Sequence, residues 1–316
     1  MSPSLIIVLA VMTLLFSMIN PIFFSLKNFQ AILSNMPLIG FLAIGLTFVI
    51  LAGNIDLSIG SIVGITAVVL ANLFDLGFNI PIPFIFIIGI LTGVILGAIN
   101  GFLVTIVGIN SVIATLGTLT AFYAVSLIIG SRTAFIYNKT FIYIGRGNIF
   151  DLIPFVFIYM IVLLILMYLL LRFTKFGRDI YLVGSNQNAA TYVGINVKKV
   201  QFLTFIISGA FASISGILFT AQIAYARGGL GAGWNFRALI ICFLAGVSAR
   251  GGRGTLVAVF ISILIITSIN NGLTLSNVPI NWRDAFEGLL LISAILIDSI
   301  RAKREMLPAR SLTKGV

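Results

Sequence analysis

The chain has 316 residues, of which 60% are hydrophobic and only 9% are charged. This composition excludes an ordinary soluble protein and indicates an integral membrane protein, expected as a single transmembrane domain over residues 1–316. The net charge of +11 does not indicate nucleic-acid binding, because the basic residues stand between apolar runs. With no histidine and only Cys242, the sequence argues against disulfides, zinc sites, any metal site and histidine acid–base chemistry.

Ten apolar runs predict an all-α integral membrane protein with about ten transmembrane helices, some short or broken by Gly or Pro. The first run has no basic segment before it and no clear small-residue cleavage site, so we expect a span there rather than a cleaved signal peptide. In chain order the runs are Leu5–Phe24, Pro37–Ala52, Ile59–Phe74, Pro83–Val107, Ser111–Gly130, Leu152–Leu171, Phe202–Tyr225, Ala238–Ala249, Thr255–Leu275 and Ala285–Ile300.

Asp56 lies in a polar break, residues 53–61, between the second and third runs. A carboxylate at the middle of a bilayer costs about 2.5 to 3.5 kcal/mol on insertion scales, so it needs a partner or a water-facing site. One interpretation places Asp56 on a solute pathway. The other makes it the cap of the next helix, its oxygens accepting hydrogen bonds from the amides of Ser58 and Ile59. The two interpretations are compatible.

Small and hydroxyl residues are frequent in the fourth and fifth runs, where close helix packing explains most of them. Asn100 is the expected exception, because a buried amide is costly unless it is hydrogen-bonded. A second polar break, residues 228–237, precedes an unusually short run, and helices that stop inside a membrane protein tend to line a cavity. The candidate pathway residues are Asn54, Asp56, Ser58, Asn100, Thr115, Thr118, Asn235, Arg237 and Asn270.

Two other polar segments are interpreted as structural, and one repeated tract is interpreted as chance. Residues 131–151 are expected to be an outward-facing connector. Residues 246–255, GVSARGGRGT, predict a tight turn, since the chain contains no Gly-Lys-Ser/Thr sequence and therefore no Walker A nucleotide site. The Leu-Ala-Gly tract at 51–53 recurs at 244–246, which we interpret as chance, because an inverted repeat would place the two tracts on opposite sides of the membrane.

The longest polar interruption is residues 172–201. A short helix is predicted within it, with Ser185 as N-cap, Asn186 to Val193 as its body and Gly194 as its C-terminal stop. Basic residues surround this helix. The segment is either a solvated connector between two spans or a docking element for a cytosolic partner.

The basic residues divide unequally between the two sides of the membrane if Met1 is cytosolic. Cytoplasmic loops carry an excess of Lys and Arg, so the division favours both termini, residues 172–201 and the basic tail 301–316 in the cytoplasm. The cytoplasmic side would receive Arg172, Lys175, Arg178, Lys198, Lys199, Arg250, Arg253, Arg301, Lys303, Arg304, Arg310 and Lys314, and the other side Lys27, Arg132, Lys139, Arg146, Arg227, Arg237 and Arg283.

Several of these segments together resemble the permease subunit of ribose-type ABC importers, the branch that includes ribose, galactofuranose and autoinducer-2 systems. The similarity extends from about Asn28 to Asp298 and includes GLTFVILAGNIDLSIGS at 45–61, AINGFLV at 98–104, VIATLGTL at 112–119 and LAGVSARGGRGT at 244–255. The most specific part is the loop, which matches at Gly177, Arg178, Tyr181, Gly184, Asn186, Ala189, Ala190, Gly194 and Ile195.

This resemblance implies the ABC importer permease fold in the bacterial inner membrane. The permease would pair with a second copy or a non-identical permease, with cytosolic ATPase subunits and with an external solute-binding protein. The loop residues would seat in a groove of the ATPase, which would hold ATP and Mg, and this chain would bind no cofactor. The implied function is not enzymatic: it is import of a small polyhydroxy solute, such as ribose, a related monosaccharide or an autoinducer-2-like compound.

One departure from the family concerns Asn235 and Arg237, which stand where relatives commonly have Glu and Asp. The altered charge could change the solute, the docking of the binding protein or the choice of permease partner. The alternative function is an ion-coupled secondary carrier, which would need a relay of buried ionisable groups. The candidates for such a relay are Asp56, with Asp284 and Glu287 near a span end. A membrane enzyme is disfavoured by the missing histidine and the lack of a paired-carboxylate site.

Overall fold

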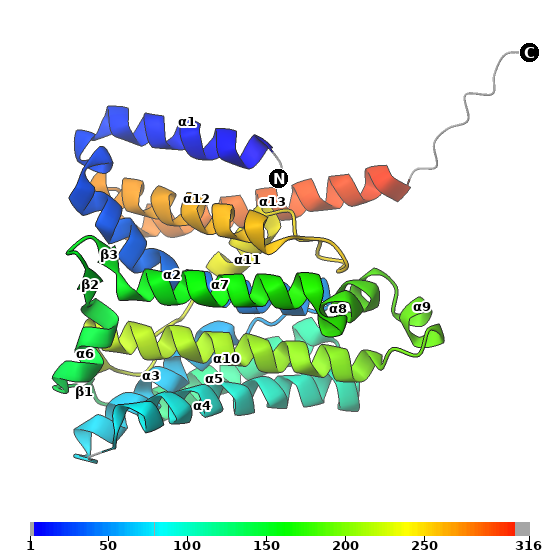
Figure 1. The fold of residues 1–316 in the computed structure, drawn as a ribbon, viewed down its shortest axis with the longest axis horizontal. Helices are drawn as coiled ribbons and strands as arrows, with labels where there is room; N and C mark the ends of the chain where they lie inside the picture. The colour runs from blue at the N-terminus through cyan, green and yellow to red at the C-terminus, as the bar shows by residue number, and fades with distance from the viewer. Residues whose placement is uncertain (1–2, 79, 307–316) are drawn as a thin grey trace, which may run out of the picture.

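The protein forms a bundle of long helices that run between two opposite ends, as seen in the computed structural model, which describes residues 3–78 and 80–306 (Figure 1). The helices are α1 (Pro3–Ile19), α2 (Leu26–Leu51), α3 (Ile59–Asp75), α4 (Ile82–Phe102), α5 (Ser111–Ile129), α6 (Lys139–Arg146), α7 (Phe155–Phe173), α8 (Lys175–Ser185), α9 (Gln187–Tyr192), α10 (Val197–Ile223), α11 (Trp234–Leu244), α12 (Leu256–Leu275) and α13 (Ile280–Met306), with a 3-10 turn η1 (Pro21–Phe24) and a π turn η2 (Leu103–Val107).

The all-α fold class is confirmed, and each of the ten apolar runs overlaps one helix; these helices are α1, α2, α3, α4, α5, α7, α10, α11, α12 and α13. In the described part of the chain, six helices are long and apolar enough to cross a membrane. Three further helices, α1, α3 and α11, are apolar but shorter. The largest boundary error is in α2, which begins at Leu26 rather than at Pro37. Pro37 lies inside the helix, because Ser25 caps its start by accepting from the Asn28 amide.

The centre of the bundle is occupied by α2 and α10. From Met36 to Ala52, only Ile39 is not buried, so α2 is surrounded by protein along this length. α10 packs against α4 at glycines: a Cβ atom on Gly93 would collide with the backbone carbonyl of Gly209, and one on Gly209 with the carbonyl of Gly93. This is the close approach that small residues permit between membrane helices.

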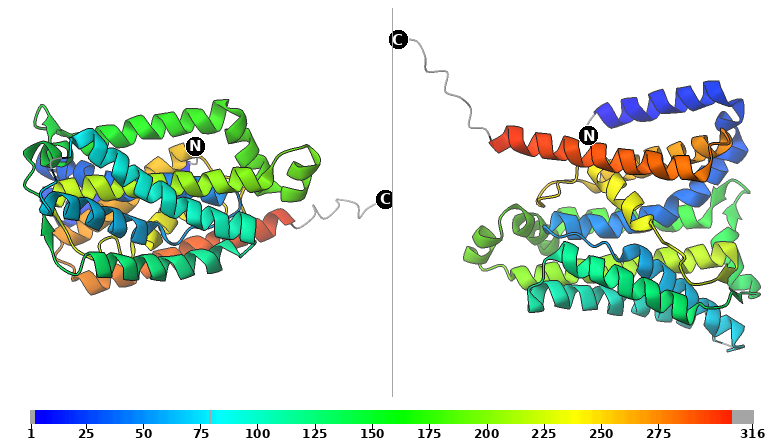
Figure 2. Two further views of the ribbon diagram at one scale, coloured as in Figure 1. Left: turned by 90° about the horizontal axis from the view of Figure 1, so that it is seen from below. Right: turned by 180° about the vertical axis from the view of Figure 1, so that it is seen from behind.

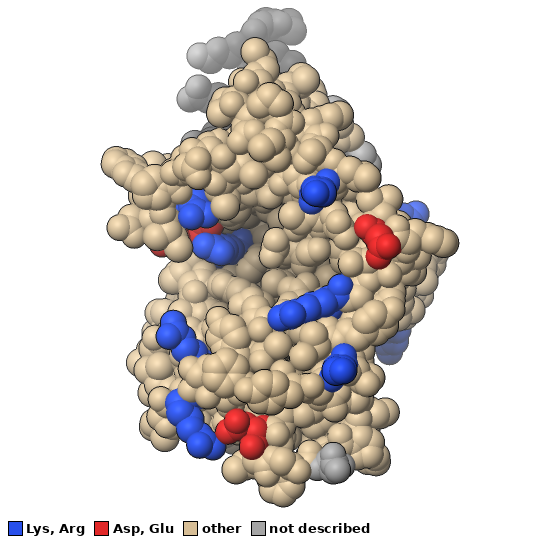
Figure 3. Space-filling model, turned by 90° about the vertical axis from the view of Figure 1, so that its left-hand side faces the viewer, with Lys and Arg blue, Asp and Glu red and all other residues tan. Residues whose placement is uncertain are grey.

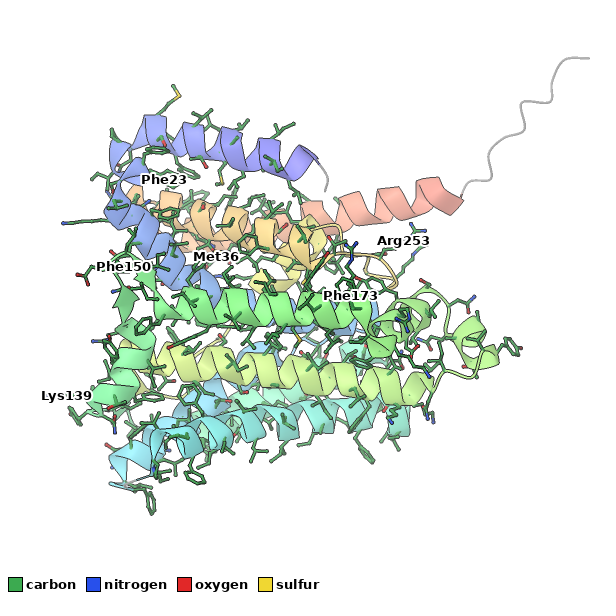
Figure 4. All side chains as sticks on the ribbon, viewed as in Figure 1. Phe23, Met36, Lys139, Phe150, Phe173 and Arg253 are labelled. Carbon is green, nitrogen blue, oxygen red and sulfur yellow. The ribbon has the colours of Figure 1, made fainter. Side chains whose placement is uncertain are left out.

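One end of the bundle, called here the α6 end, carries α6 and four short strands. β1 (Ala134–Phe135) pairs antiparallel with β4 (Tyr225–Ala226), and β2 (Asn148–Ile149) pairs with β3 (Ile153–Pro154). Lys139 and Phe150 lie at this end, whereas Phe173 and Arg253 lie at the other, called the α8 end (Figure 4). The expectation of a plain connector over residues 131–151 is therefore wrong, because this segment folds and pairs with residues after α10.

The two Leu-Ala-Gly tracts end α2 and α11 in the same way, so their likeness has a structural cause rather than the chance we inferred. Gly53 and Gly246 have φ of 82° and 77°. Their amides donate to Ile50 and Phe243, and the amides of the following residues donate to Val49 and Cys242. This is the hydrogen-bond pattern of a Schellman C-cap, which favours glycine at the left-handed position.

Candidate functional site

Asp56 is fully buried in the non-helical segment between α2 and α3. Its Oδ1 accepts from the Ser58 amide at 3.0 Å and from the Ser58 hydroxyl at 2.8 Å, and its Oδ2 accepts from the hydroxyl of Ser208 on α10 at 3.0 Å. The capping expectation is thus correct for Ser58 and wrong for Ile59, because the second oxygen is directed to α10. These donors offset the cost of burying the carboxylate.

The hydrogen bonds continue from Ser58 to α4 and α5. Asn100 donates to the Ser58 hydroxyl at 2.7 Å, and the Thr118 hydroxyl donates to the Asn100 side-chain oxygen at 2.7 Å. Thr115 donates to the backbone carbonyls of Ser111 and, at 3.2 Å, of Ile55. The chain of bonds joins the break before α3 to α4, α5 and α10, which explains why Asn100 is not merely a packing residue.

Five of the nine predicted pathway residues take part in these hydrogen bonds, and a sixth, Asn54, lies two residues before Asp56 in the same break. All six are less than 9% exposed, and Asn54 keeps a buried side-chain nitrogen without a hydrogen-bond partner among the described residues. The structure brings them together as a packed polar junction; their role in a pathway stays a prediction. We call this set the Asp56 cluster: Asn54, Asp56, Ser58, Asn100, Thr115 and Thr118.

Arg237 and Asn270 lie instead in a cavity of about 400 Å³, called here the α6-end cavity. The face of the molecule at this end is hollowed (Figure 3). The cavity walls come from α2, α10, α11, α12 and α13, so that segments distant in the sequence meet there. The lining residues are Ile32, Asn35, Leu38, Ile39, Phe219, Trp234, Arg237, Ile266, Thr267, Asn270, Asn271, Thr274, Ile280, Arg283 and Asp284.

Arg237 is held by two acidic residues on α13. Its Nε donates to Glu287 Oε2 at 2.8 Å, and its Nη2 lies 3.7 Å from Asp284 Oδ1. From the sequence, both carboxylates are expected near a span end, with no partner indicated. Two features of the sequence could have paired them with Arg237. Asp284 and Glu287 are three residues apart, which places both carboxylates on one face of a helix. Arg237 is a charged residue in a membrane helix, which is unfavourable unless it has a partner of opposite charge.

Asn235 and Arg237 are two residues apart on α11, so their side chains point to different faces of the helix. Asn235 is 3% exposed and packs toward α3, where a Cβ on Gly60 would lie 3.4 Å from its side-chain oxygen. Its side-chain nitrogen is buried without a hydrogen-bond partner among the described residues. The two departures from the family pattern therefore serve different surroundings: Asn235 is a contact between helices, and Arg237 is part of the α6-end cavity.

The segment 172–201 forms two helices at the α8 end, α8 and α9, in place of the single predicted helix. The predicted N-cap is wrong by one residue. Ser185 ends α8, and Asn186 caps α9 by accepting from the Ala189 amide at 3.0 Å. The predicted stop is correct, since Gly194 has φ of 79° and follows the last turn of α9.

The family-matched residues of this segment divide into an attachment to the bundle and an exposed tip. Gly177 packs against the last carbonyls of α7, and Gly184 against Leu51 at the end of α2, so that a Cβ at either position would collide with backbone. Tyr181 donates to the Gly254 carbonyl at 3.0 Å. Burial raises the pKa of Tyr181 above its usual value, which keeps this donor protonated.

The tip of the segment is α9 and the residues after it. Ala189 is exposed, whereas Ala190 is only 2% exposed and packs inward. Tyr192 is 91% exposed and Val193 is 72% exposed, at the end that carries Arg178, Lys198 and Lys199. Both ends of the bundle, and the projection of α8 and α9 from one of them, can be followed from below and from behind (Figure 2).

Together, the bundle of apolar helices, the helix breaks inside it and the projecting α8–α9 segment define a multi-pass transmembrane permease. The chain belongs to the family described as branched-chain amino acid transport system / permease component, which matches residues 28–295. This confirms the resemblance to ribose-type ABC importer permeases, and with it a transport subunit rather than an enzyme.

The curated relatives include three autoinducer 2 import system permease proteins LsrC. The chain is 31% identical to that of Photorhabdus luminescens over 311 residues, which cover 96% of this chain and 93% of the relative. It is 32% identical to that of Yersinia pestis (strain Pestoides F) over 92% of this chain and 83% of the relative. It is 32% identical to that of Yersinia enterocolitica over 93% of this chain and 81% of the relative. No solved structure matches.

Proposed function

We propose that this chain is the membrane subunit of an ATP-driven importer that carries a small polyhydroxy solute, such as a monosaccharide or an autoinducer-2-like compound, across the bacterial inner membrane. The family supports import, and the named relatives support this class of solute. The α8 end faces the cytoplasm in this proposal, and the α6 end faces the solute-binding protein. The charge division of the sequence supports this orientation.

The single observation that carries the proposal is the way the α8–α9 segment is built. Its first part is fixed to the ends of α2 and α7 by glycine contacts, and its tip exposes Tyr192 and Val193 to a partner. A solvated connector needs neither feature. We propose that a cytosolic ATPase, a separate chain that holds ATP and Mg, binds this tip and transmits its motion through α8 to α2.

A second permease copy, or a non-identical permease, completes the proposed assembly. The exposed apolar faces of α4 and α5, which include Ile95, Ile113 and Ile128, are available to lipid and to such a partner.

The proposal is tested by reconstituting the chain in vesicles with and without its ATPase and binding protein. We expect solute uptake with the whole assembly and ATP, and no uptake by the chain alone under a proton or sodium gradient. Uptake driven by the gradient without any ATPase would support the ion-coupled carrier instead. Sealed vesicles that release a trapped dye at the same rate in both cases control for leakage.

A further inference from the structure

We infer that the α6-end cavity is a binding site for one neutral polyhydroxy solute, complete within a single copy of the chain, and that it discriminates against phosphorylated analogues. This inference rests on the proposed import function and goes beyond it by assigning the site, the number of chains that build it and the charge of its ligand. A dimer of this chain would then carry two such sites rather than one shared site.

The size and walls of the cavity suit a small solute. Its volume of about 400 Å³ lies within the usual range of small-molecule sites, roughly 300 to 1,000 Å³. Trp234 and Phe219 form one wall, with their ring centroids 4.8 Å apart. Such a wall offers an apolar surface to the carbon–hydrogen face of a sugar ring, while the other walls supply polar groups.

Two polar groups of the lining have unused hydrogen-bonding capacity. Asn271 donates to Asn28 at 2.8 Å, but its own side-chain oxygen is buried and has no partner among the described residues. Arg283 donates from Nη1 to Thr274 at 2.6 Å, while its Nε is buried and finds no partner in the described part of the chain. Both atoms are closed to solvent in this structure, and leaving them unpaired is unfavourable. An occupant that supplies both a donor and an acceptor would be stabilised when these two side chains turn toward it. A hydroxyl group supplies both.

The charges around the cavity cancel. The formal charges of Arg237 and Arg283 equal in number those of Asp284 and the neighbouring Glu287, and both carboxylates contact the Arg237 guanidinium. The Arg283 guanidinium is bonded instead to the Thr274 hydroxyl. A phosphate at Arg237 would have to displace a carboxylate, and a phosphate at Arg283 would be repelled by Asp284, the next residue in the chain and part of the same lining. The arginine at position 237, which departs from the family pattern, therefore adds no free positive charge to the site.

The test uses accessibility to thiol reagents, which does not depend on transport. Asn270→Cys is made in the full chain with Cys242→Ser, and the reaction with a membrane-impermeant methanethiosulfonate is timed. Phe150→Cys, at a residue 94% exposed at the same end, is the matched control. The probes are D-ribose, a panel of other neutral pentoses, hexoses and pentitols, and ribose 5-phosphate.

We expect at least one neutral sugar or pentitol to slow labelling of the cysteine at 270, by about tenfold at ten times its dissociation constant. It should leave the cysteine at 150 unaffected, and ribose 5-phosphate should protect neither. Glu287→Gln removes one negative charge, so it should make the anionic sulfonatoethyl reagent react faster at position 270 relative to the cationic trimethylammonioethyl reagent. Protection by no neutral compound, or equal protection by ribose 5-phosphate, would overturn the inference.

The outcome of the labelling experiment can be distinguished from the outcome of the uptake experiment that tests the proposed function. Labelling is measured without the ATPase and without ATP. If the assembly imports solute with ATP but the cysteine at 270 is never protected, the cavity assignment fails while the importer stands. If protection occurs and the chain alone moves solute on an ion gradient, the site stands while the importer proposal fails.

Discussion

The hydroxyl of Tyr181 on α8 donates to the backbone carbonyl of Gly254, in the turn before α12, at 3.0 Å. This bond ties the segment that projects from the α8 end to the connection between α11 and α12. The Gly252 amide donates in turn to the Leu51 carbonyl at 2.9 Å, so α8, α2 and this turn meet at one point. Movement imposed on α9 would therefore reach two membrane helices at once.

Tyr181→Phe removes this bond and leaves the ring. Loss of one partly buried hydrogen bond should lower the free energy of unfolding by about 0.5 to 1.5 kcal/mol, measured by thermal unfolding in detergent. The Tyr181→Phe variant should insert normally in the membrane. Because burial raises the tyrosine pKa, the wild type should also lose stability as the pH rises past the ordinary tyrosine value, and Tyr181→Phe should lose less. Unchanged stability and pH dependence would show that the bond contributes nothing.

Gly184→Ala tests the close contact between α8 and α2. The added methyl group would collide with the Leu51 carbonyl, and overpacking of this kind costs about 1 to 3 kcal/mol. Gly117→Ala is the control, because that helical position has open space around it and alanine favours the helix. We expect a lower melting temperature and weaker ATPase association for the first variant only. Equal behaviour of the two variants would contradict the contact.

Asp56→Ala removes the acceptor at the centre of the Asp56 cluster. The donors from Ser58 and Ser208 would stay buried without it, at about 1 to 3 kcal/mol for each unsatisfied group. Asp75→Ala breaks only the pair with Arg132, whose side chain is 71% exposed, so it should cost less than about 1 kcal/mol. Urea or thermal unfolding compares the two. A variant at position 56 no less stable than the one at position 75 would show that the cluster does not hold the helices.

Arg237→Gln and Glu287→Gln should each destabilise the chain, and the double variant should cost less than their sum. The two side chains are 30% and 13% exposed, so removing one leaves the other partly desolvated. We expect a coupling of about 0.5 to 3 kcal/mol from a double-mutant cycle on unfolding. Additive losses would mean that the pair forms no stabilising interaction.

Much of this architecture follows from residues that act locally. The apolar runs predict the long helices, and Gly194 predicts the end of α9. Both predictions succeed because membrane spans and caps depend on residues that are neighbours in the chain. Ser185 was misassigned as a cap because it and Asn186 are both good N-cap residues, and packing of α8 against Leu51 decides between them. No local pattern indicates that long-range packing.

The candidate site was less predictable than the fold. The sequence identified Asp56 and Asn100 as costly polar residues, but their connection depends on Ser208, which is far along the chain on α10. Likewise, Arg237 and Asn270 are far apart in the sequence, and only the packing of α11 against α12 and α13 places them in one cavity with Asp284. Hydrogen-bond partners distant in the sequence are set by topology, which composition and spacing do not specify.

The most direct test of the ATPase-docking claim is the substitution Ala189→Glu at the exposed tip of α9. Tyr137→Glu, at a residue 82% exposed at the α6 end, places the same charge away from the proposed contact. Both variants are assembled with the ATPase and binding protein in vesicles, and ATP-driven uptake is measured together with co-purification of the ATPase. We predict that Ala189→Glu inserts and folds like the wild type but loses ATPase binding and uptake, while Tyr137→Glu retains ATPase binding. Full ATPase binding and uptake by Ala189→Glu would contradict the account.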